Sequence, residues 1–431
     1  MSDAQTAPAQ PSPSPGRSSP SAWKRNVTVF LASQALSMFG SSLVQYAIMW
    51  HITLSTKSGI AMTLSIVCGF VPSFLISPFG GVFADRYDRK RMIMLADGLV
   101  ALVSAALALA YGLGGGALWL LLTAQALRSV GQALQMPAVG AILPQLVPEG
   151  ELMRVNGLNQ TILSAVMLVS PIASGALLSW FSISAIFLVD VATAVPAIAI
   201  LAFFLKIEPR KAKEKADLAA VEKGYLHDLV LGFRYIRDHR YLAGFFRYIA
   251  VLFFLVTPAA FLTPLQATRT FGDQVWRLTA IEIAFSVGMM IGGALLASWG
   301  GFRNRVRTML TANLLWAFCT LALGLVPWFW LYLAFMVLFG VAMPAYHAPM
   351  TTMLQERVEA DFMGRVFGVQ VMLQTSIMPL SMLIFGPLAD AVQIEFILIG
   401  TGALMLVQAV LTYRDARLLE AGEPKETADS N

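Results

Sequence analysis

The chain has 431 residues, of which 57% are hydrophobic and only 13% are charged. A soluble domain carries about twice that charged fraction, so these residues cannot cover a surface that faces water. The composition therefore excludes a soluble globular protein and predicts that lipid surrounds most of the chain. The net charge of +5 does not indicate nucleic-acid binding, because the basic residues are spread over short loops, a pattern typical of membrane topology.

The two ends of the chain differ from the rest. Residues 1–22 are rich in Pro, Ser and Ala and contain no apolar stretch, so we expect a disordered cytoplasmic tail rather than a signal peptide. We expect a second disordered tail over residues 418–431. Cys68 and Cys319 lie inside apolar runs and cannot form a disulfide framework.

Apolar stretches long enough to cross a bilayer recur between the tails. A helix needs about 20 apolar residues to span about 30 Å of hydrocarbon. The sequence therefore predicts an all-α membrane protein with twelve transmembrane helices. The predicted spans are 27–52, 59–84, 92–113, 117–142, 157–180, 183–206, 242–267, 276–300, 306–327, 329–350, 365–390 and 394–414.

The orientation of the spans follows from the positions of Lys and Arg. With the N-terminus in the cytoplasm, about 25 of the 30 basic residues fall in cytoplasmic segments. Lys57, Arg269 and Arg277 fall on the outer side. This asymmetry predicts a multi-pass protein of the inner (cytoplasmic) membrane, with both termini in the cytoplasm.

The longest polar stretch, residues 207–241, lies between the sixth and seventh spans. It divides the chain into an N-terminal six-helix bundle, 23–206, and a C-terminal six-helix bundle, 242–417. The second part of this linker predicts an amphipathic helix on the inner face of the membrane. Its apolar residues at helical spacing are Leu226, Leu229, Phe233 and Ile236.

The two halves contain related sequences. Met136-Pro-Ala recurs as Met343-Pro-Ala, and Gly175-Ala-Leu recurs in the same order as Gly386-Pro-Leu. Two parallel repeats in a transporter meet at a substrate site near the middle of the membrane. The repeat therefore predicts two pseudo-symmetric bundles with the site between them.

A charged motif connects the second and third spans. It reads Gly81-Val-Phe-Ala-Asp85-Arg86-Tyr-Asp-Arg89-Lys90, and it resembles the signature G-x-x-x-D-R-x-x-R-[KR] of Major Facilitator Superfamily transporters. The resemblance implies that family's fold of twelve helices in two bundles. It also implies a latch that closes the cytoplasmic side when the transporter faces outward.

The residue types of this motif suit a latch. Gly81 lets two helices approach closely. Asp85 can accept hydrogen bonds from a helix N-terminus of the other half and can pair with Arg89. For Arg86 and Lys90, an alternative is that they only set the topology. We expect Asp97, near the cytoplasmic start of the third span, to support the latch.

Two acidic residues lie within spans, Asp190 in the N-terminal half and Glu282 in the C-terminal half. A charge in the membrane is costly, so each is a candidate functional residue. An apolar cleft favours the neutral form of a carboxyl group, so both are predicted to exchange protons. Arg128, midway along the fourth span, keeps its charge and is predicted to tune a nearby carboxylate. The alternative for all three is a structural pairing.

Further motifs narrow the resemblance to the macrolide-efflux branch of the superfamily, over residues 23–417. That branch also has acids at the positions of Asp190 and Glu282. Its neighbours include siderophore exporters and less specific drug exporters. The motifs that carry the resemblance are Trp50-His-Ile-Thr, Ala96-Asp97, Arg128-Ser-Val-Gly, Glu282-Ile-Ala-Phe-Ser-Val-Gly and Gly364-Arg365-Val-Phe.

The composition also indicates the kind of cargo. Twenty-one Met and 27 Phe supply soft, re-packable walls that suit a bulky apolar substrate. Tyr46, Phe253, Phe254 and Tyr346 are candidate substrate-binding residues, although aromatic side chains in a membrane protein also face lipid.

The sequence thus predicts a proton-coupled exporter of small lipophilic molecules that works by alternating access. One alternative is an exporter of an endogenous metabolite such as a siderophore or lipid. Another is a non-transporting receptor or scaffold with the same fold. No metal, phosphate-loop or nucleophile motif is present in the sequence, so we expect neither a cofactor, a metal nor enzymatic activity. We also expect a monomer.

Overall fold

The structure, a computed structural model, describes residues 20–205 and 218–423. Over these residues it contains fifteen α-helices, one short 3-10 helix and no strand. The prediction of an all-α fold is confirmed. The helices of the N-terminal half are α1 (Pro20–Thr56), α2 (Gly59–Arg86), α3 (Arg89–Gly112), α4 (Leu118–Leu146), η1 (Glu149–Glu151), α5 (Leu152–Trp180) and α6 (Ile183–Phe204).

The remaining helices begin after the residues that the structure leaves undescribed, 206–217. They are α7 (Leu218–Asp238), α8 (Arg240–Phe261), α9 (Thr263–Thr270), α10 (Val275–Trp299), α11 (Arg305–Leu325), α12 (Phe329–Arg357), α13 (Ala360–Ala391), α14 (Ile394–Tyr413) and α15 (Ala416–Ala421).

Each predicted span coincides with a long helix, with one exception. The span predicted over 242–267 is broken at Leu262 into α8 and α9, because Pro264 occupies the first turn of α9, where proline favours a new helix start. In the described part of the chain, eleven spans are long and apolar enough to cross a membrane. Helix α4 has the length, but Gln125, Arg128 and Gln132 interrupt its apolar run.

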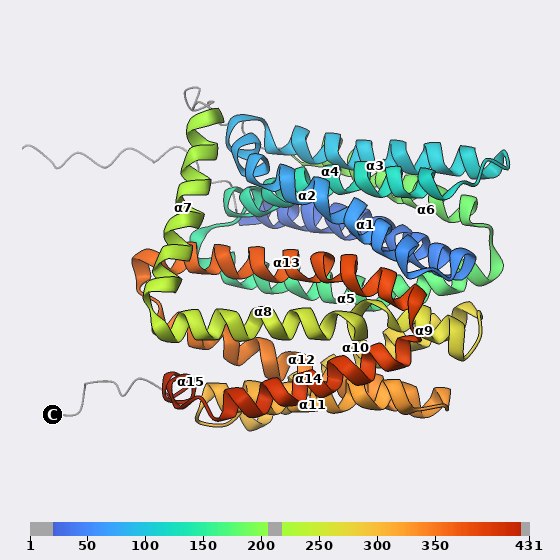
Figure 1. Cartoon of the computed structure of the whole chain (residues 1–431). Coiled ribbons are helices and arrows are strands. Elements are labelled where there is room, and N and C mark those ends of the chain that lie inside the picture. The colour runs from blue at the N-terminus through green and yellow to red at the C-terminus, as the bar shows by residue number, and fades with distance from the viewer. Residues whose placement is uncertain (1–19, 206–217, 424–431) are drawn as a thin grey trace, which may run out of the picture.

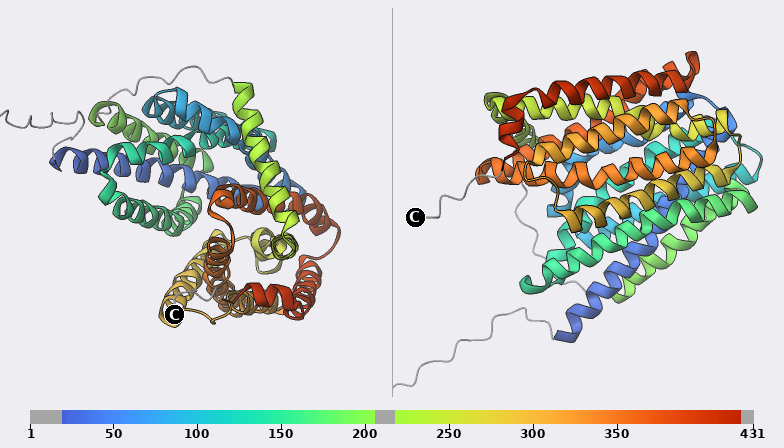
Figure 2. Two further views of the ribbon diagram at one scale, coloured as in Figure 1. Left: turned by 90° about the vertical axis from the view of Figure 1, so that its left-hand side faces the viewer. Right: turned by 90° about the horizontal axis from the view of Figure 1, so that it is seen from below.

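The helices form two groups that lie side by side (Figures 1 and 2). Helices α1–α6 make one group and α8–α14 the other. Two pairs of helices make most of the contact between the groups, since α2 packs against α13 and α5 packs against α10; α9 also contacts α1. We call these pairs the α2–α13 seam and the α5–α10 seam.

The repeated glycines lie in these seams. A Cβ atom on Gly175 of α5 would lie 1.8 Å from Thr279 Oγ1 of α10, and one on Gly386 of α13 would lie 1.7 Å from Thr63 Oγ1 of α2. Both contacts are far shorter than side-chain packing permits, so only glycine allows the helices to approach this closely. The sequence repeat therefore reflects two equivalent helix contacts between the halves.

Helix α7 crosses one end of the bundle, roughly at right angles to the long helices (Figure 1). We call this the α7 end, and the opposite end the α1–α2 end. Asp228 of α7 accepts a hydrogen bond from Arg365 Nε of α13 at 2.8 Å. Ile236 is buried and Phe233, three residues earlier on the same face, is exposed, so the bundle covers the predicted apolar face only in part. Its position on the inner face of the membrane stays a prediction.

Residues 418–423, which the sequence analysis assigned to the C-terminal tail, are packed against the bundle. Helix α15 is tied to the bundle through residues 418–423, since Leu418 is buried and Asn304 Nδ2 donates to the Leu419 carbonyl at 2.7 Å. These apolar and polar contacts come from distant helices, which a local reading of the sequence cannot reveal. Residues 424–431 and 1–19, which contain most of the predicted tails, lie outside the described residues.

The apolar core of the N-terminal half is divided along the helix axes. One cluster, including Phe30, Ile142 and Leu201, lies toward the α7 end. A second, including Ile48 and Phe187, lies toward the α1–α2 end. This half also contains buried polar residues, among them three of the predicted functional side chains, Asp97, Arg128 and Asp190.

Candidate functional site

Arg128 and Asp190 form an ion pair in the middle of the N-terminal half. Their side chains are 1% exposed, and Arg128 Nη1 donates to Asp190 Oδ2. Ser104 Oγ donates to the same oxygen at 2.6 Å, and Ser41 Oγ donates to Oδ1 at 3.2 Å. The pair thus joins α4 and α6 with the help of α1 and α3.

Both charged groups of this pair have further hydrogen-bond partners. Arg128 Nη2 also donates to the Ser41 carbonyl at 3.1 Å, so the guanidinium has a backbone partner as well as the carboxylate. A buried charge is tolerated when an opposite charge and further hydrogen bonds replace water. The structure therefore brings together two residues that the sequence placed only on separate spans.

Gly131 explains why α3 and α4 can bring their polar side chains together. A Cβ atom at this position would lie 2.9 Å from Val100 Cγ2 and 3.2 Å from the Ala96 carbonyl oxygen of α3. The absence of a side chain lets the two helices pack closely. The Gly of the Arg128-Ser-Val-Gly motif thus sets the distance between Ser104 and Arg128.

Asp97 is the second buried acid of the N-terminal half and has no cationic partner among the described residues. It is 3% exposed. Its Oδ1 atom accepts hydrogen bonds from Ser37 Oγ and Gln135 Nε2, both at 2.7 Å, and its Oδ2 atom is buried without a partner. Asp97 therefore links α3 to α1 and α4 inside the N-terminal half, through neutral groups.

Glu282 lies on the face of α10 that looks toward the N-terminal half. Thr279, one turn earlier, contacts Gly175 across the α5–α10 seam, and residues three apart share a helix face. Tyr46 of α1 lies within electrostatic reach of the carboxylate. Glu282 is half-buried, and the described side chains supply it with neither an ion pair nor a hydrogen bond.

The four candidate substrate-binding residues separate into two kinds. Tyr46 and Phe254 are half-buried. Phe253 and Tyr346 are buried in the core of the C-terminal half, where their ring centroids lie 6.0 Å apart in a T-shaped arrangement. In this conformation, only Tyr46 and Phe254 have partly accessible side chains.

Two basic residues of the family signature, Arg89 and Lys90, bind backbone carbonyls within the N-terminal half. Arg89 Nη1 donates to the Ala141 carbonyl at 2.7 Å. Lys90 Nζ donates to the carbonyls of Ala202 and Leu205 at 2.9 and 2.8 Å, at the C-terminus of α6, where a cation is favoured. Asp88 caps the N-terminus of α3.

The other signature residues are described only by their backbone. Gly81, Asp85 and Arg86 form the last turns of α2, and their side chains lie outside the described part of the structure. The latch that the resemblance implies for Asp85 therefore stays a prediction.

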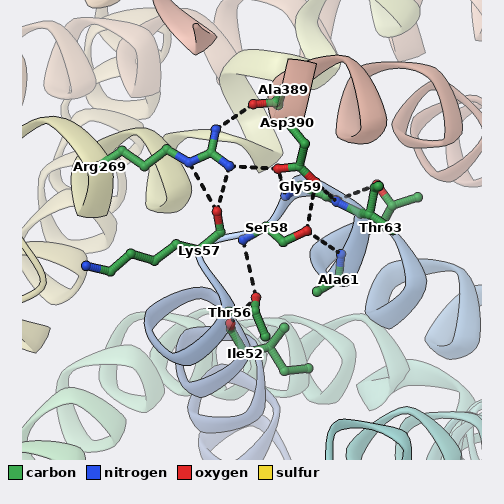
Figure 3. A network of polar contacts seen from close by, with 11 residues as sticks. Ile52, Thr56, Lys57, Ser58, Gly59, Ala61, Thr63, Arg269, Ala389 and Asp390 are labelled. Atoms are coloured by element: carbon green, nitrogen blue, oxygen red, sulfur yellow. Dashed lines mark hydrogen bonds and ion pairs between the residues drawn. The ribbon is translucent and has the colours of Figure 1, made fainter. Parts of the chain in front are cut away.

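The structure contains a second polar cluster, at the α1–α2 end, that our sequence analysis did not predict (Figure 3). Asp390, at the end of α13, caps the N-terminus of α2. Ser58 Oγ donates to Oδ2 at 2.7 Å, and the backbone N–H groups of Gly59 and Ile60 donate to the two carboxylate oxygens at 2.7 and 2.9 Å.

Arg269 of α9 completes this cluster. Its Nη2 atom donates to Asp390 Oδ1 at 2.7 Å and to the Lys57 carbonyl at 2.6 Å. Lys57 has a φ of 48°, a left-handed conformation that is uncommon for a side chain of this size. The strained turn directs its carbonyl to Arg269, while its ammonium lies 3.3 Å from the Asp273 carboxylate.

These contacts all lie at one end of the molecule. Among the described side chains, every hydrogen bond between the two halves (residues 20–205 and 240–423) involves a residue from 57 to 63. Thr63 Oγ1, for example, donates to the Met382 carbonyl at 2.9 Å. The conformation is therefore closed at the α1–α2 end.

The described residues offer no metal site, because no group of three or more His, Cys, Asp or Glu side chains could hold an ion. The arrangement instead combines a compensated ion pair, a half-buried acid between the halves and a polar contact at one end.

Comparisons with known proteins agree with this architecture. The chain is 27% identical over 392 residues to Macrolide efflux protein A of Streptococcus pyogenes, covering 90% of this chain and 95% of that protein. It is 24% identical over 379 residues to the multidrug efflux pump Tap of Mycobacterium bovis, covering 84% and 86%. A crystal structure of the nucleoside transporter NupG aligns with a TM-score of 0.69 at 11% identity, over 91% of this chain and 99% of that chain.

A sequence profile of the Major Facilitator Superfamily matches residues 30–382. This match spans both groups of helices, from α1 to α13, and includes the signature that runs from the last turns of α2 into α3. The resemblance predicted from the motifs is confirmed, and the chain is a membrane transporter of the Major Facilitator Superfamily that resembles its macrolide-efflux branch.

Proposed function

We propose that this transporter exports small lipophilic molecules, macrolides among them, in exchange for protons. The observation that carries the proposal is the position of Glu282, a half-buried acid between the halves without a cationic partner among the described residues. Efflux is supported by relatives that are named as macrolide and multidrug efflux proteins. The same arrangement would serve export of an endogenous lipophilic metabolite, which differs in cargo and not in mechanism.

Glu282 is suited to proton exchange because no described side chain near it fixes its charge. A carboxylate without a cation in an apolar site is favoured in its protonated form. When the halves separate on either side, water reaches the group and favours ionisation. Glu282 can therefore exchange its proton only with the side to which the site is open.

Asp190 and Arg128 take a different role in this proposal. Protonation of Asp190 would leave Arg128 buried without a counter-charge, which is costly. We therefore assign proton exchange to Glu282 and assign the Arg128–Asp190 pair to holding α4 and α6 in position beside α1.

The membrane potential can drive such an exchange. One proton that crosses the membrane releases about 2.3 kcal/mol per 100 mV. Since a tenfold gradient costs about 1.4 kcal/mol, one proton sustains roughly a 40-fold gradient of a neutral substrate at 100 mV.

The proposed orientation follows the positive-inside rule, with both termini in the cytoplasm. The α1–α2 end then faces outward, and the closed contact at that end corresponds to an inward-facing conformation.

Glu282→Gln tests the proposal directly. The substitution keeps the shape of the side chain but removes its titration, so proton-dependent substrate uptake into everted vesicles, the equivalent of export from the cell, should fall to background. Glu395→Gln is the matched control, since Glu395 accepts a hydrogen bond from Thr270 within the C-terminal half and should keep full export.

A protonophore distinguishes coupling from binding. It should abolish export by the unaltered protein and leave the Glu282→Gln variant unchanged. Undiminished, protonophore-sensitive export by the variant would remove Glu282 from the mechanism. A susceptibility panel in an efflux-deficient host that expresses the chain would separate drug export, which raises resistance, from export of a metabolite, which does not.

A further inference from the structure

The α2–α13 seam contains two copies of one short motif. Helix α2 ends in Gly81-Val-Phe-Ala-Asp85, the first part of the family signature, and α13 ends in Gly386-Pro-Leu-Ala-Asp390. In each copy the glycine precedes the aspartate by four residues, so both lie on one face of their helix, one turn apart. The second copy does not follow the repeat of the two halves, in which Gly386 corresponds to Gly175.

The two helices run antiparallel, which relates the copies in space. Helix α2 begins at Gly59 at the α1–α2 end, where α13 finishes with Ala391. The end of α2, with Asp85, therefore lies toward the α7 end, where α13 begins at Ala360. Each helix thus carries an aspartate in its last turns, at the end of the seam where the other helix has its N-terminus.

The second copy is engaged in this structure. The Asp390 carboxylate accepts the N–H groups of Gly59 and Ile60 and the hydroxyl of Ser58. The two N–H groups belong to the first turn of α2 and have no partner within the helix, and the helix dipole also favours a negative charge there. Asp390 therefore binds the N-terminus of α2 in the way that the family resemblance implies for Asp85 at a helix of the other half.

The glycine of this copy is required by the close approach. A Cβ atom on Gly59 would lie 2.2 Å from the Gly386 carbonyl oxygen, and one on Gly386 would lie 2.7 Å from the Gly59 carbonyl oxygen. Backbone atoms on both sides make these contacts, so neither helix can yield. The glycine allows the backbones to touch, which places Asp390 within reach of the α2 N-terminus.

The α5–α10 seam provides an internal comparison. Ser179, four residues after Gly175, occupies the place that Asp390 has after Gly386, and its hydroxyl donates to the Gly175 carbonyl within its own helix. This seam has the glycine contact without a cap. The capping aspartate is therefore a separate addition to the α2–α13 seam and does not follow from close packing alone.

We propose that Gly386, Asp390 and Arg269 form a second latch, the counterpart of the signature latch at the other end of the same seam. The second latch stabilises the conformation that is closed at the α1–α2 end, and Asp85 stabilises the conformation that is closed at the α7 end. Arg269 is a positioning residue, since it holds Asp390 and the Lys57 carbonyl together. Only the assignment of these states to a transport cycle rests on the proposed export function.

Distance measurements between spin labels test the latch. Labels at Leu113→Cys and Trp328→Cys report the α1–α2 end, and labels at Gly150→Cys and Ala360→Cys report the α7 end. Asp390→Asn removes the ion pair with Arg269 and one of the two acceptor oxygens at the α2 N-terminus. It should therefore shift the ratio of closed to open molecules at the α1–α2 end about tenfold toward open. The labels at the α7 end should move closer together.

Two further variants define the result. Asp85→Asn should shift both distances in the opposite direction, and Glu395→Gln, which alters an acid bonded only within the C-terminal half, should change neither. If Asp390→Asn fails to fold, Arg269→Gln should shift the ratio of closed to open molecules in the same direction by a smaller factor. Unchanged distances in Asp390→Asn or Arg269→Gln would overturn the proposal. The measurement needs neither substrate nor proton gradient, so it stands apart from a failure of proton-coupled export.

Discussion

At the scale of single residues, the three acids Asp97, Asp190 and Glu282 differ most clearly in their partners. Asp190 has a cationic partner in Arg128, Asp97 has only neutral donors, and Glu282 has neither within the described residues. Sequence analysis identified Asp190 and Glu282 because charges within apolar spans are rare, and it predicted Asp97 as a support of the latch. It could not assign their roles, since the partners come from other helices.

The stability of the N-terminal half should depend on Asp190 far more than on Asp97. Asp190→Asn leaves Arg128 buried without a counter-charge, and the free energy of unfolding should fall by about 3–5 kcal/mol. Asp97→Asn leaves no cation unpaired and keeps an acceptor for Ser37 and Gln135, so the loss should be about 1 kcal/mol or less. Thermal unfolding of the purified protein in detergent measures both.

A double substitution gives the control for this prediction. Arg128→Met with Asp190→Asn removes both charges, and it should be more stable than Asp190→Asn alone. Equal stability of the single and double variants would show that the ion pair is not the cause.

At the scale of helices, glycine contacts with backbone atoms decide which faces meet. In α10, Gly288 and Gly292 face α12, where their Cβ atoms would lie 2.0 and 2.3 Å from the carbonyl oxygens of Val337 and Val341. A Cβ atom on Gly293, by contrast, would have no atom within 4 Å. The sequence contained this Gly-x-x-x-Gly spacing, but only the packing identifies which of the adjacent glycines is in contact.

Alanine substitutions at adjacent positions of α10 should therefore differ in sign. Gly292→Ala places a methyl group against the α12 backbone and should lower the free energy of unfolding by about 1–3 kcal/mol or more. Gly293→Ala meets no atom and improves helix propensity, so stability should stay the same or rise by up to about 1 kcal/mol. Chemical or thermal unfolding in detergent compares the two, and similar losses in both variants would contradict the contact.

At the scale of the whole molecule, two halves join through two seams and are hydrogen-bonded to each other only at the α1–α2 end, as far as the described side chains extend. These polar bonds hold the halves together at the α1–α2 end, whereas the side chains of Asp85 and Arg86, toward the α7 end, lie outside the described part of the structure. The alternating access that we propose requires contacts that close one end at a time.

Cysteine labelling tests the predicted orientation of the whole bundle. In a chain with Cys68→Ala and Cys319→Ala, Leu113→Cys is exposed between α3 and α4 and should react with a membrane-impermeant maleimide in intact cells. Gly150→Cys, between α4 and α5, should react only after the cells are opened. The reverse pattern would invert the topology and would make the closed end cytoplasmic.

The sequence by itself determined the fold class, the positions of the spans and the resemblance to the family, because these depend on local composition and on residues close together in the chain. It also identified Asp190, Glu282 and Arg128 as unusual. Only the tertiary structure decided that Arg128 neutralises Asp190 and that Asp390 caps α2. Both contacts join residues from different helices, and the choice of partner depends on which helix faces pack together, which the periodicity of one helix does not specify.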